Sequence, residues 1–421
     1  MDPAKQRRAT GFRRVLGGLR EAWLAVGLTL LALALAEGAA RLALSLRRPA
    51  PDARIQADAY PAEPWVAELY AENARSSRMR WESYVYWRRL PFAGSQINVD
   101  QRGLRRTWRP PAAVGKPAAA TVFFLGGSTA WGTGARDDHT IPSELARYLA
   151  GAGVPAAITN FGESGYVSTQ AVITLLRELQ RGNVPDLVVC YVGMNDTVAT
   201  CQNRGAGLPL NESNRVREFN LLRHARRLMR EALAAAAARS ALLRLAGLAG
   251  GPGSPSPAPT GRPDARLIDE TLRSVDANLR TVDGLAASYG FRTSFFWEPC
   301  IFEKPHRTAY EESRAAVLVF ARDLLLATYD RVRRDWAARG PDEFTYLGDL
   351  FAGTTAPRFV DHDHTSETAD REIAAAIGRQ LLEHGRLRGS AGRGPTNRAV
   401  GAEGIPSRRP RVPAQEPTRA R

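Results

Sequence analysis

Short apolar runs alternate with longer helical segments along the chain from residue 119 onward. Strands separated by helices are typical of βαβ units and a parallel sheet. The pattern therefore predicts an α/β fold, a three-layer α/β/α sandwich with a central parallel sheet of about five strands. The expected strands are 121–125, 156–161, 187–192, 293–297 and 344–347, and the expected helices lie near 140–150, 168–181, 308–337 and 367–385.

An insertion at 213–263 interrupts the alternation after the third apolar run. Its first part, 213–247, is rich in Ala, Leu and Arg and predicts helix, with a basic face that is either solvated or in contact with anionic lipid. Its second part, 250–263, consists mostly of Gly, Pro and Ser and predicts a flexible loop. The tail at 388–421 is rich in Arg, Gly and Pro and poor in apolar residues, which predicts a disordered basic tail.

These boundaries define a main domain at 119–387. Residues 47–118 precede it and are dense in Trp and Tyr without a clean periodicity, with one short helix expected near 62–75. Aromatic density of this kind more often reflects packing than ligand binding. We therefore expect an N-terminal extension at 47–118 that packs on the main domain.

A long apolar segment lies near the N-terminus. Residues 22–36 carry no charge, and Glu37 and Arg41 then stand four residues apart, where they can pair on one helical face. A helix over 22–46 would be about 37 Å long, which is enough to span a bilayer. We expect an uncleaved transmembrane signal anchor; the alternative is a cleaved signal peptide with Ala34-Leu35-Ala36 as its small-x-small site.

The net charge of +15 is concentrated at the two ends of the 421-residue chain. Residues 1–20 contribute +5 and residues 386–421 contribute +7, which leaves +3 for everything between them. Because the folded part is close to neutral, the sequence argues against a dedicated nucleic-acid surface. By the positive-inside rule, the basic segment 1–21 is expected in the cytoplasm and the rest of the chain outside it.

Polar turns that contain glycine follow each of the first three expected strands. They are Gly126-Gly127-Ser128, Gly162-Glu163-Ser164-Gly165 and Gly193-Met194-Asn195-Asp196, and Asp361-His362-Asp363-His364 precedes the last expected helix. Each of them is weak alone. Because parallel strands place their carboxyl ends at one edge of the sheet, where ligands bind in such folds, we expect these segments to converge.

The converging residues are those that acyl transfer needs. Ser128 can act as the nucleophile, His364 as its base, and Asp361 can hold the imidazole tautomer through the second ring nitrogen. The oxyanion of a tetrahedral intermediate needs preorganised donors. The backbone N–H groups of Ser128 and Gly165 and the side-chain amide of Asn195 are the candidates.

These motifs, in this order, resemble those of the SGNH/GDSL hydrolase family over roughly 119–385. Gly126-Gly127-Ser128 is similar to its first block, with glycine where many members have aspartate before the serine. Asn160-Phe161-Gly162-Glu163-Ser164-Gly165 is similar to the second, Gly193-Met194-Asn195-Asp196 to the third, and Asp361-His362-Asp363-His364 to the fifth. The N-terminal anchor is also similar to membrane-anchored members.

The resemblance implies a serine esterase in which Ser128, Asp361 and His364 are catalytic and Gly165 and Asn195 serve the oxyanion hole. It implies an ester substrate, an acyl ester of carbohydrate or lipid, and no cofactor or metal. One alternative is an O-acyltransferase that passes an acetyl group to a cell-surface polysaccharide. A second is a membrane-tethered glycan-binding protein without catalysis, against which the intact catalytic set argues.

Two further readings concern ligand-forming side chains outside the proposed nucleophile. His362 and His364 together with Asp361 and Asp363 are residue types that could bind a metal, although no further ligand cluster accompanies them. Cys201 and Cys300 both follow expected strands. Outside the cytoplasm they could form a disulfide, and independent buried thiols are the alternative.

Overall fold

The structure is a computed structural model that describes residues 3–46, 52–61, 63–110, 120–221, 225–245, 264–340 and 343–387. The flexible loop expected at 250–263 and the basic tail expected at 388–421 lie outside these residues.

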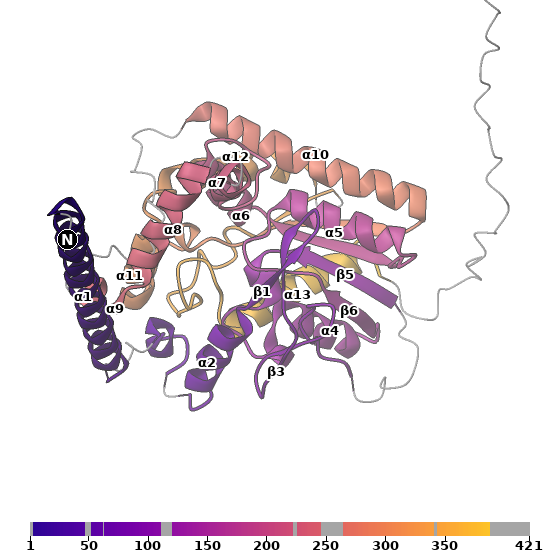
Figure 1. Ribbon diagram of the computed structural model, residues 1–421. Coiled ribbons are helices and arrows are strands. Elements are labelled where there is room, and N and C mark those ends of the chain that lie inside the picture. Colours follow the sequence, from indigo (N-terminus) through magenta and orange to yellow (C-terminus); the bar gives the residue numbers. More distant parts are fainter. Residues whose placement is uncertain are drawn as a thin grey trace, which may run out of the picture.

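A five-stranded parallel sheet forms the centre of the main domain (Figure 1). The strands lie in the order β6-β5-β7-β8-β9, and all neighbouring pairs are parallel. The chain steps from β5 to β6 on one side and then returns to β7 on the other. The carboxyl ends of β5 and β7 therefore flank the switch point, where ligands bind in open α/β sheets. The strands are β5 (Ala120–Gly126), β6 (Ala156–Asn160), β7 (Leu187–Val192), β8 (Arg292–Trp297) and β9 (Thr345–Tyr346).

Helices cover both faces of the sheet, so the expected three-layer sandwich is confirmed. Along β5, Phe123 and Leu125 face one apolar cluster and Val122 and Phe124 face the other, as the alternation of side chains in a strand requires. Figure 1 shows α5 and α10 on one side of the sheet and α4 and α13 on the other. The first cluster includes α5 (Ser168–Gln180), α10 (Ala265–Tyr289) and α12 (Arg322–Asp335), and the second includes α4 (Ile141–Gly151) and α13 (Glu367–Glu383).

Two helical segments differ from the sequence prediction. The single helix expected near 308–337 is divided into α11 (Ala309–Ala315), a 3-10 turn at Ala316–Leu318 and α12. The turn carries the buried side chain of Leu318 into the core. Helix α10 was not predicted at all, although its apolar positions follow the three- and four-residue spacing of a helix that packs on a sheet.

The insertion is helical where the structure describes it. It contains α7 (Glu212–Leu221), α8 (Ala225–Arg239) and α9 (Ala241–Leu245), after α6 (Met194–Asn203). The carboxylate of Glu37 accepts hydrogen bonds from the backbone N–H groups of Ala241 and Leu242, at 2.9 and 3.1 Å, and also pairs with Arg41 at 2.9 Å. The insertion is therefore tied to the N-terminal helix through the charged pair of that helix.

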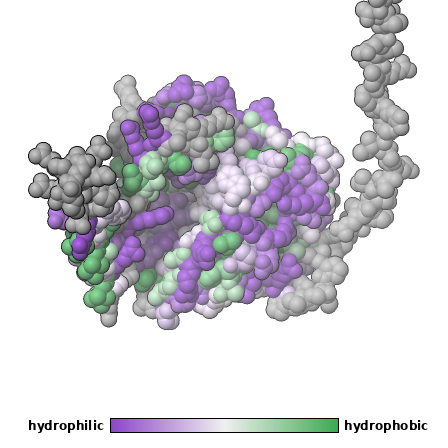
Figure 2. All heavy atoms as spheres, viewed as in Figure 1, coloured by the Kyte–Doolittle hydropathy of each residue, from purple (hydrophilic) through white to green (hydrophobic). Residues whose placement is uncertain are grey.

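The N-terminal helix α1 runs from Pro3 to Leu46, further toward the N-terminus than the sequence prediction. Its part from Gly17 to Leu46 is long and apolar enough to cross a membrane, and most of its apolar side chains are exposed, although Ala40 is buried. Figure 2 shows hydrophobic side chains gathered at the left of the molecule, where α1 lies in Figure 1. A membrane anchor and a signal sequence both fit this helix.

The N-terminal extension packs against the main domain. Backbone pairing of Arg105 with Asn160 attaches it to the edge strand β6, and a buried ion pair of 2.9 Å joins Arg105 to Asp137. The hydroxyl of Tyr60 donates to the carbonyl of Gly134 at 2.8 Å. The elements of the extension are η1 (Ala53–Gln56), α2 (Val66–Ser76), β1 (Met79–Glu82), β2 (Tyr86–Arg89), β3 (Phe92–Ala93) and β4 (Asn98–Val99).

Candidate active site

Ser128 lies at the switch point of the sheet, directly after β5. It is the first residue of the short helix α3 (Ser128–Trp131), whose N-cap is Gly127. The first N–H groups of a helix have no partner within it, so the backbone N–H of Ser128 is available to an oxyanion. The serine is 6% exposed. Its side chain is therefore largely buried at this edge of the sheet.

Asn195 lies next to Gly127, the residue that precedes Ser128. It follows β7 in α6, and a Cβ atom added to Gly127 would lie only 2.2 Å from its Nδ2 atom. Nδ2 donates one hydrogen to the carbonyl of Tyr166, at 3.0 Å. Because an amide nitrogen carries two hydrogens, this bond fixes the side chain and leaves a second donor beside the serine.

The second polar turn closes on the same segment. The backbone N–H of Glu163 donates to the carbonyl of Gly126 at 3.3 Å, and a Cβ atom on Gly162 would lie 2.4 Å from the backbone nitrogen of Trp131. Gly165 has a φ of +71°, in the left-handed region that favours glycine. Three of the four expected segments therefore meet around Ser128.

Asp361 and His364 form a closely bonded pair. The imidazole Nδ1 lies 2.8 Å from the nearer oxygen of the Asp361 carboxylate, which also accepts the backbone N–H groups of His364, at 2.8 Å, and of Asp363, at 3.1 Å. The carboxylate thus fixes both the ring and the backbone of the histidine. Nε2 of His364 is buried and has no hydrogen-bond partner among the described residues. No hydrogen bond joins Ser128 to His364 within the described part of the chain; in free enzymes such bonds are often long.

Charges around His364 favour its protonated form. Burial acts to lower the pKa of His364, but the Asp361 and Asp363 carboxylates outweigh it and hold that pKa above its ordinary value. The Asp363 oxygen lies 3.0 Å from Nδ1. Conversely, burial acts to raise the pKa of Asp361, but the neighbouring His364 and His362 outweigh it and hold it well below its usual range. The carboxylates of this loop therefore stabilise the imidazolium that forms when His364 takes a proton.

A buried ion pair holds the loop at 358–364, which carries His364. Glu311 accepts the backbone N–H groups of Arg358, at 2.8 Å, and Phe359, at 3.1 Å, and pairs with Lys304 at 2.5 Å. Both charged side chains are fully buried. The Tyr310 hydroxyl also donates to the carbonyl of Val360 at 2.7 Å. Removing one partner of such a pair is costly, so the loop is held rigidly.

This loop lies beside the segment that follows Ser128. A Cβ atom on Gly134 would lie 2.8 Å from the Val360 side chain and 3.1 Å from the carbonyl of Thr365. A bidentate ion pair between Arg136 and Glu367 adds a second connection between the two segments. The fourth polar segment is therefore packed on the turn after α3, on the side of the fold that carries the other three.

Two charged residues at this site were not identified from the sequence. Arg54, in the N-terminal extension, places Nη1 3.6 Å from the Asp361 carboxylate. Glu298 is buried directly after β8 and accepts the backbone N–H of Met194 at 2.8 Å. Burial raises the pKa of Glu298 to about 8. A polar residue at the end of a buried strand was a usable signal for Glu298, whereas nothing in the sequence connects Arg54 with Asp361.

Three side chains of this loop are also close enough together to hold a metal ion. One ligand atom from each of Asp361, His362 and Asp363 lies within 4.8 Å of the others. The Asp361 carboxylate, however, already serves His364 with both oxygens. A metal ion and His364 would therefore use the same carboxylate, and the effect of a chelator on activity distinguishes the metal hypothesis from the serine hypothesis.

The three cysteines are free in the structure. Cys201 donates weakly to the carbonyl of Phe320, at 3.5 Å, and burial raises the pKa of Cys300 to about 12. The expected disulfide between Cys201 and Cys300 is therefore absent from the structure, and of these two thiols Cys300 is buried whereas Cys201 is only partly buried.

The fold and this geometry together define a doubly wound α/β protein with a serine, a histidine–aspartate pair and amide donors at the switch point of its sheet. The model of the GDSL-like lipase/acylhydrolase family matches residues 124–293. Residues 124–293 are therefore a GDSL-like lipase/acylhydrolase domain. The match includes the segments of Ser128, Gly165 and Asn195 and ends before Asp361, so the histidine–aspartate pair rests on the geometry above.

The chain is also similar to several solved structures. One is a gut microbial diltiazem-metabolizing enzyme, BT4096, with 12% identity and a TM-score of 0.34 over 66% of this chain and 48% of that one; the chain spans about half the length of that enzyme. A lipase/acylhydrolase from Enterococcus faecalis has 13% identity and a TM-score of 0.34, over 64% of this chain and 97% of its own. A family 3 carbohydrate esterase from Clostridium thermocellum has 14% identity and a TM-score of 0.30, over 63% and 96%. No curated protein matches the chain.

Proposed function

We propose that this protein is a serine ester hydrolase that works through an acyl-Ser128 intermediate. The observation that carries the proposal is the state of His364: its Nδ1 is fixed by Asp361 at 2.8 Å, and its Nε2 is buried without a partner among the described residues. A buried ring nitrogen without a partner is costly unless a reacting group uses it. Ser128, in the neighbouring segment, supplies that group.

In this reaction Ser128 attacks the carbonyl carbon of the ester while His364 Nε2 takes the hydroxyl proton. The C–O bond of the tetrahedral intermediate then breaks, and the alcohol leaves with that proton. Water attacks the acyl-serine with His364 again as base, and the acid product departs as Ser128 recovers its proton. Asp361 holds the tautomer and stabilises the imidazolium in both halves.

The negative charge of each tetrahedral intermediate falls on the former carbonyl oxygen. We assign its stabilisation to the backbone N–H groups of Ser128 and Gly165 and to the second hydrogen of Asn195 Nδ2. These donors are fixed before substrate binds, because Asn195 is held by the carbonyl of Tyr166 and sits against Gly127. Preorganised donors of this kind cost no reorganisation at the moment of reaction.

We place the active domain outside the cytoplasm, anchored by α1, with esters of carbohydrate or lipid as substrates. The six basic residues before the apolar part of α1 support this orientation through the positive-inside rule. A reporter enzyme fused after residue 60 is expected to be active outside the cytoplasm. Cytoplasmic activity of that fusion would overturn the placement.

The experiment that tests the function measures the turnover of acyl esters of rising chain length by the full-length protein, solubilised in detergent. Each ester is tested once with water as the only acyl acceptor and once with polysaccharide added. Hydrolysis in water that disappears in Ser128→Ala supports the hydrolase. Acetyl transfer to the polysaccharide without hydrolysis would replace it by an O-acyltransferase. Absence of both, with polysaccharide binding retained, would leave a glycan-binding protein.

A further inference from the structure

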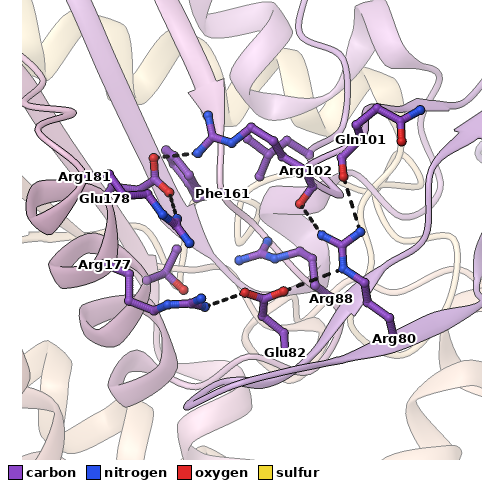
Figure 3. Close-up of a pocket in the computed structure, with 11 residues that line it drawn as sticks. Arg80, Glu82, Arg88, Gln101, Arg102, Phe161, Arg177, Glu178 and Arg181 are labelled. Carbon is purple, nitrogen blue, oxygen red and sulfur yellow. Dashed lines mark hydrogen bonds and ion pairs between the residues drawn. The ribbon is translucent and has the colours of Figure 1, made fainter.

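A cavity rich in arginine lies between the N-terminal extension and the main domain. It has a volume of about 410 Å³ and shares no residue with the catalytic set. Figure 3 shows side chains converging on it from the β1–β2 hairpin, from the turn at 101–104 and from α5. A volume of this order is typical of sites for small ligands. The charged residues that line it are Arg80, Glu82, Arg88, Arg102, Arg177, Glu178 and Arg181.

The positive charge of the cavity is only partly compensated. Five arginines and two glutamates line it, an excess of three positive charges. Glu82 pairs with Arg177 at 2.6 Å and more loosely with Arg80 at 3.6 Å. Glu178 likewise pairs with two arginines, Arg102 and Arg181, each at a distance of 2.5 Å. Both carboxylates of the cavity are therefore paired with four of the arginines, and neither pairs with the fifth.

The fifth arginine, Arg88, lies at the centre of the cavity. Figure 3 shows its guanidinium group between Glu82 and Arg102, with no interaction to any other residue drawn. Arg88 is only 5% exposed, and its Nη1 has no hydrogen-bond partner among the described residues. A buried guanidinium nitrogen without an acceptor carries an uncompensated desolvation cost.

Contacts outside the cavity do not satisfy Arg88. Its ion-pair contact, to Glu163, is 4.0 Å long. The Glu163 carboxylate already accepts the backbone N–H and Nε of Arg89, at 3.0 and 3.3 Å, and the backbone N–H of Ser164. The Arg88 guanidinium also lies 5.2 Å from the centre of the Tyr166 ring. A ring face does not replace an oxygen acceptor for Nη1.

We propose that this cavity binds a phosphate group of a small ligand, with Arg88 as its central contact. A phosphate supplies two negative charges and several acceptor oxygens, which match the excess of positive charge and the unsatisfied Nη1. The planar fork of arginine binds phosphate through two parallel hydrogen bonds. The cavity is large enough to hold a phosphate together with part of the group to which it is esterified.

Two sources supply this chemistry, a soluble phosphate monoester and the headgroup of a phospholipid. The test is calorimetric titration of the full-length protein in detergent at low salt. The soluble probes are inorganic phosphate and glucose 1-phosphate; the lipid probes are dihexanoyl phosphatidic acid and, without a monoester phosphate, dihexanoyl phosphatidylcholine. Saturable binding of glucose 1-phosphate indicates a soluble ligand, and binding of phosphatidic acid alone indicates a lipid headgroup. No saturable binding of any monoester overturns the proposal.

Variants assign the binding to the cavity. Arg88→Met keeps the apolar stem but removes the charge, and about tenfold or greater weakening is expected, because the phosphate loses its central charge-assisted hydrogen bonds. Arg181→Gln, at a half-exposed position, is expected to weaken binding with little risk to folding. Arg379→Gln, with the same charge change on the exposed face of α13, is the control and should bind as the wild type does. Equal binding by wild type, Arg88→Met and Arg181→Gln would contradict the proposal, whatever the esterase assay shows.

Discussion

Arg54 of the N-terminal extension reaches to 3.6 Å from the carboxylate of Asp361, more than 300 positions further along the chain. It is held there by a two-oxygen contact with Asp52 and by the face of the Tyr70 ring, 4.6 Å from its guanidinium carbon. The extension therefore supplies a charge to the histidine–aspartate pair of the main domain. The extension therefore contacts the candidate active site as well as the rest of the main domain.

The first prediction is that Arg54 positions Asp361. In Arg54→Met the carboxylate loses one of the charges that hold it, so we expect kcat to fall about tenfold with KM nearly unchanged, since Arg54 is not assigned to substrate binding. Arg54→Lys should recover part of the loss. Arg75→Met, an exposed arginine on α2 of the same extension, is the control. A rise in KM at constant kcat would contradict the positioning role.

The second prediction concerns the space beside Gly127. A methyl group there would meet the Asn195 amide at 2.2 Å, so Gly127→Ala should displace that donor. We expect a loss in kcat of about 10²–10³, similar to that of Asn195→Ala. In the double variant the two losses should not add, because both remove the same donor. Gly284→Ala, on α10 with open space around it, is the control; full additivity would separate Gly127 from the oxyanion hole.

The third prediction concerns pH. Because the Asp361 and Asp363 carboxylates hold the pKa of His364 above its ordinary value of 6.5, the neutral imidazole that acts as base accumulates only as pH rises. The acid limb of the kcat/KM profile should therefore have its midpoint above 6.5. Asp363→Asn removes one carboxylate and should move the midpoint to lower pH, whereas Asp349→Asn, at an exposed position, should not. A midpoint at 6.5 in the wild type would contradict this electrostatic picture.

The fourth prediction concerns the stability contributed by Glu298. Burial raises its pKa from 4.5 to about 8, so the folded protein keeps a proton that the unfolded chain releases at lower pH. The free energy of unfolding therefore has its full contribution from Glu298 below about pH 4.5. That contribution is lost as the pH rises to about 8, and the loss amounts to up to a few kcal/mol. Glu298→Gln, an uncharged mimic of the acid, should flatten this dependence in denaturant unfolding. The control Glu383→Gln, at an exposed position, should keep it, and an unchanged slope in Glu298→Gln would show that Glu298 is ionised in the fold.

The sheet could be predicted because its strands are local, continuous apolar runs; β7 has the predicted bounds. The β1–β2 hairpin could not be predicted. Residues 83–85, which connect its strands, include none of the glycine or asparagine signals that usually mark such a turn, although Tyr84 and the first strand residue Tyr86 have positive φ values of 71° and 73°. Tertiary contacts with the main domain, such as the bond from Gln170 to the carbonyl of Val85, hold it instead.

The candidate site was predictable where its residues follow strands, because the parallel topology brings strand ends together. Ser128 and Asn195 were placed on this basis, and the structure packs Asn195 against Gly127, the residue before Ser128. Arg54 and Arg88 could not be placed in this way. Their positions depend on how the extension folds against the main domain, which no local pattern in the sequence encodes.

The most direct test of the account is covalent labelling of the full-length protein with a fluorophosphonate, followed by peptide mapping. We predict that Ser128 is labelled, that Ser128→Ala is not, and that His364→Ala and Asp361→Asn react much more slowly, because the serine hydroxyl needs the oriented imidazole to take its proton. A chelator should change neither labelling nor turnover. Full ester turnover by Ser128→Ala, or turnover lost with a chelator and restored by zinc, would contradict the serine mechanism.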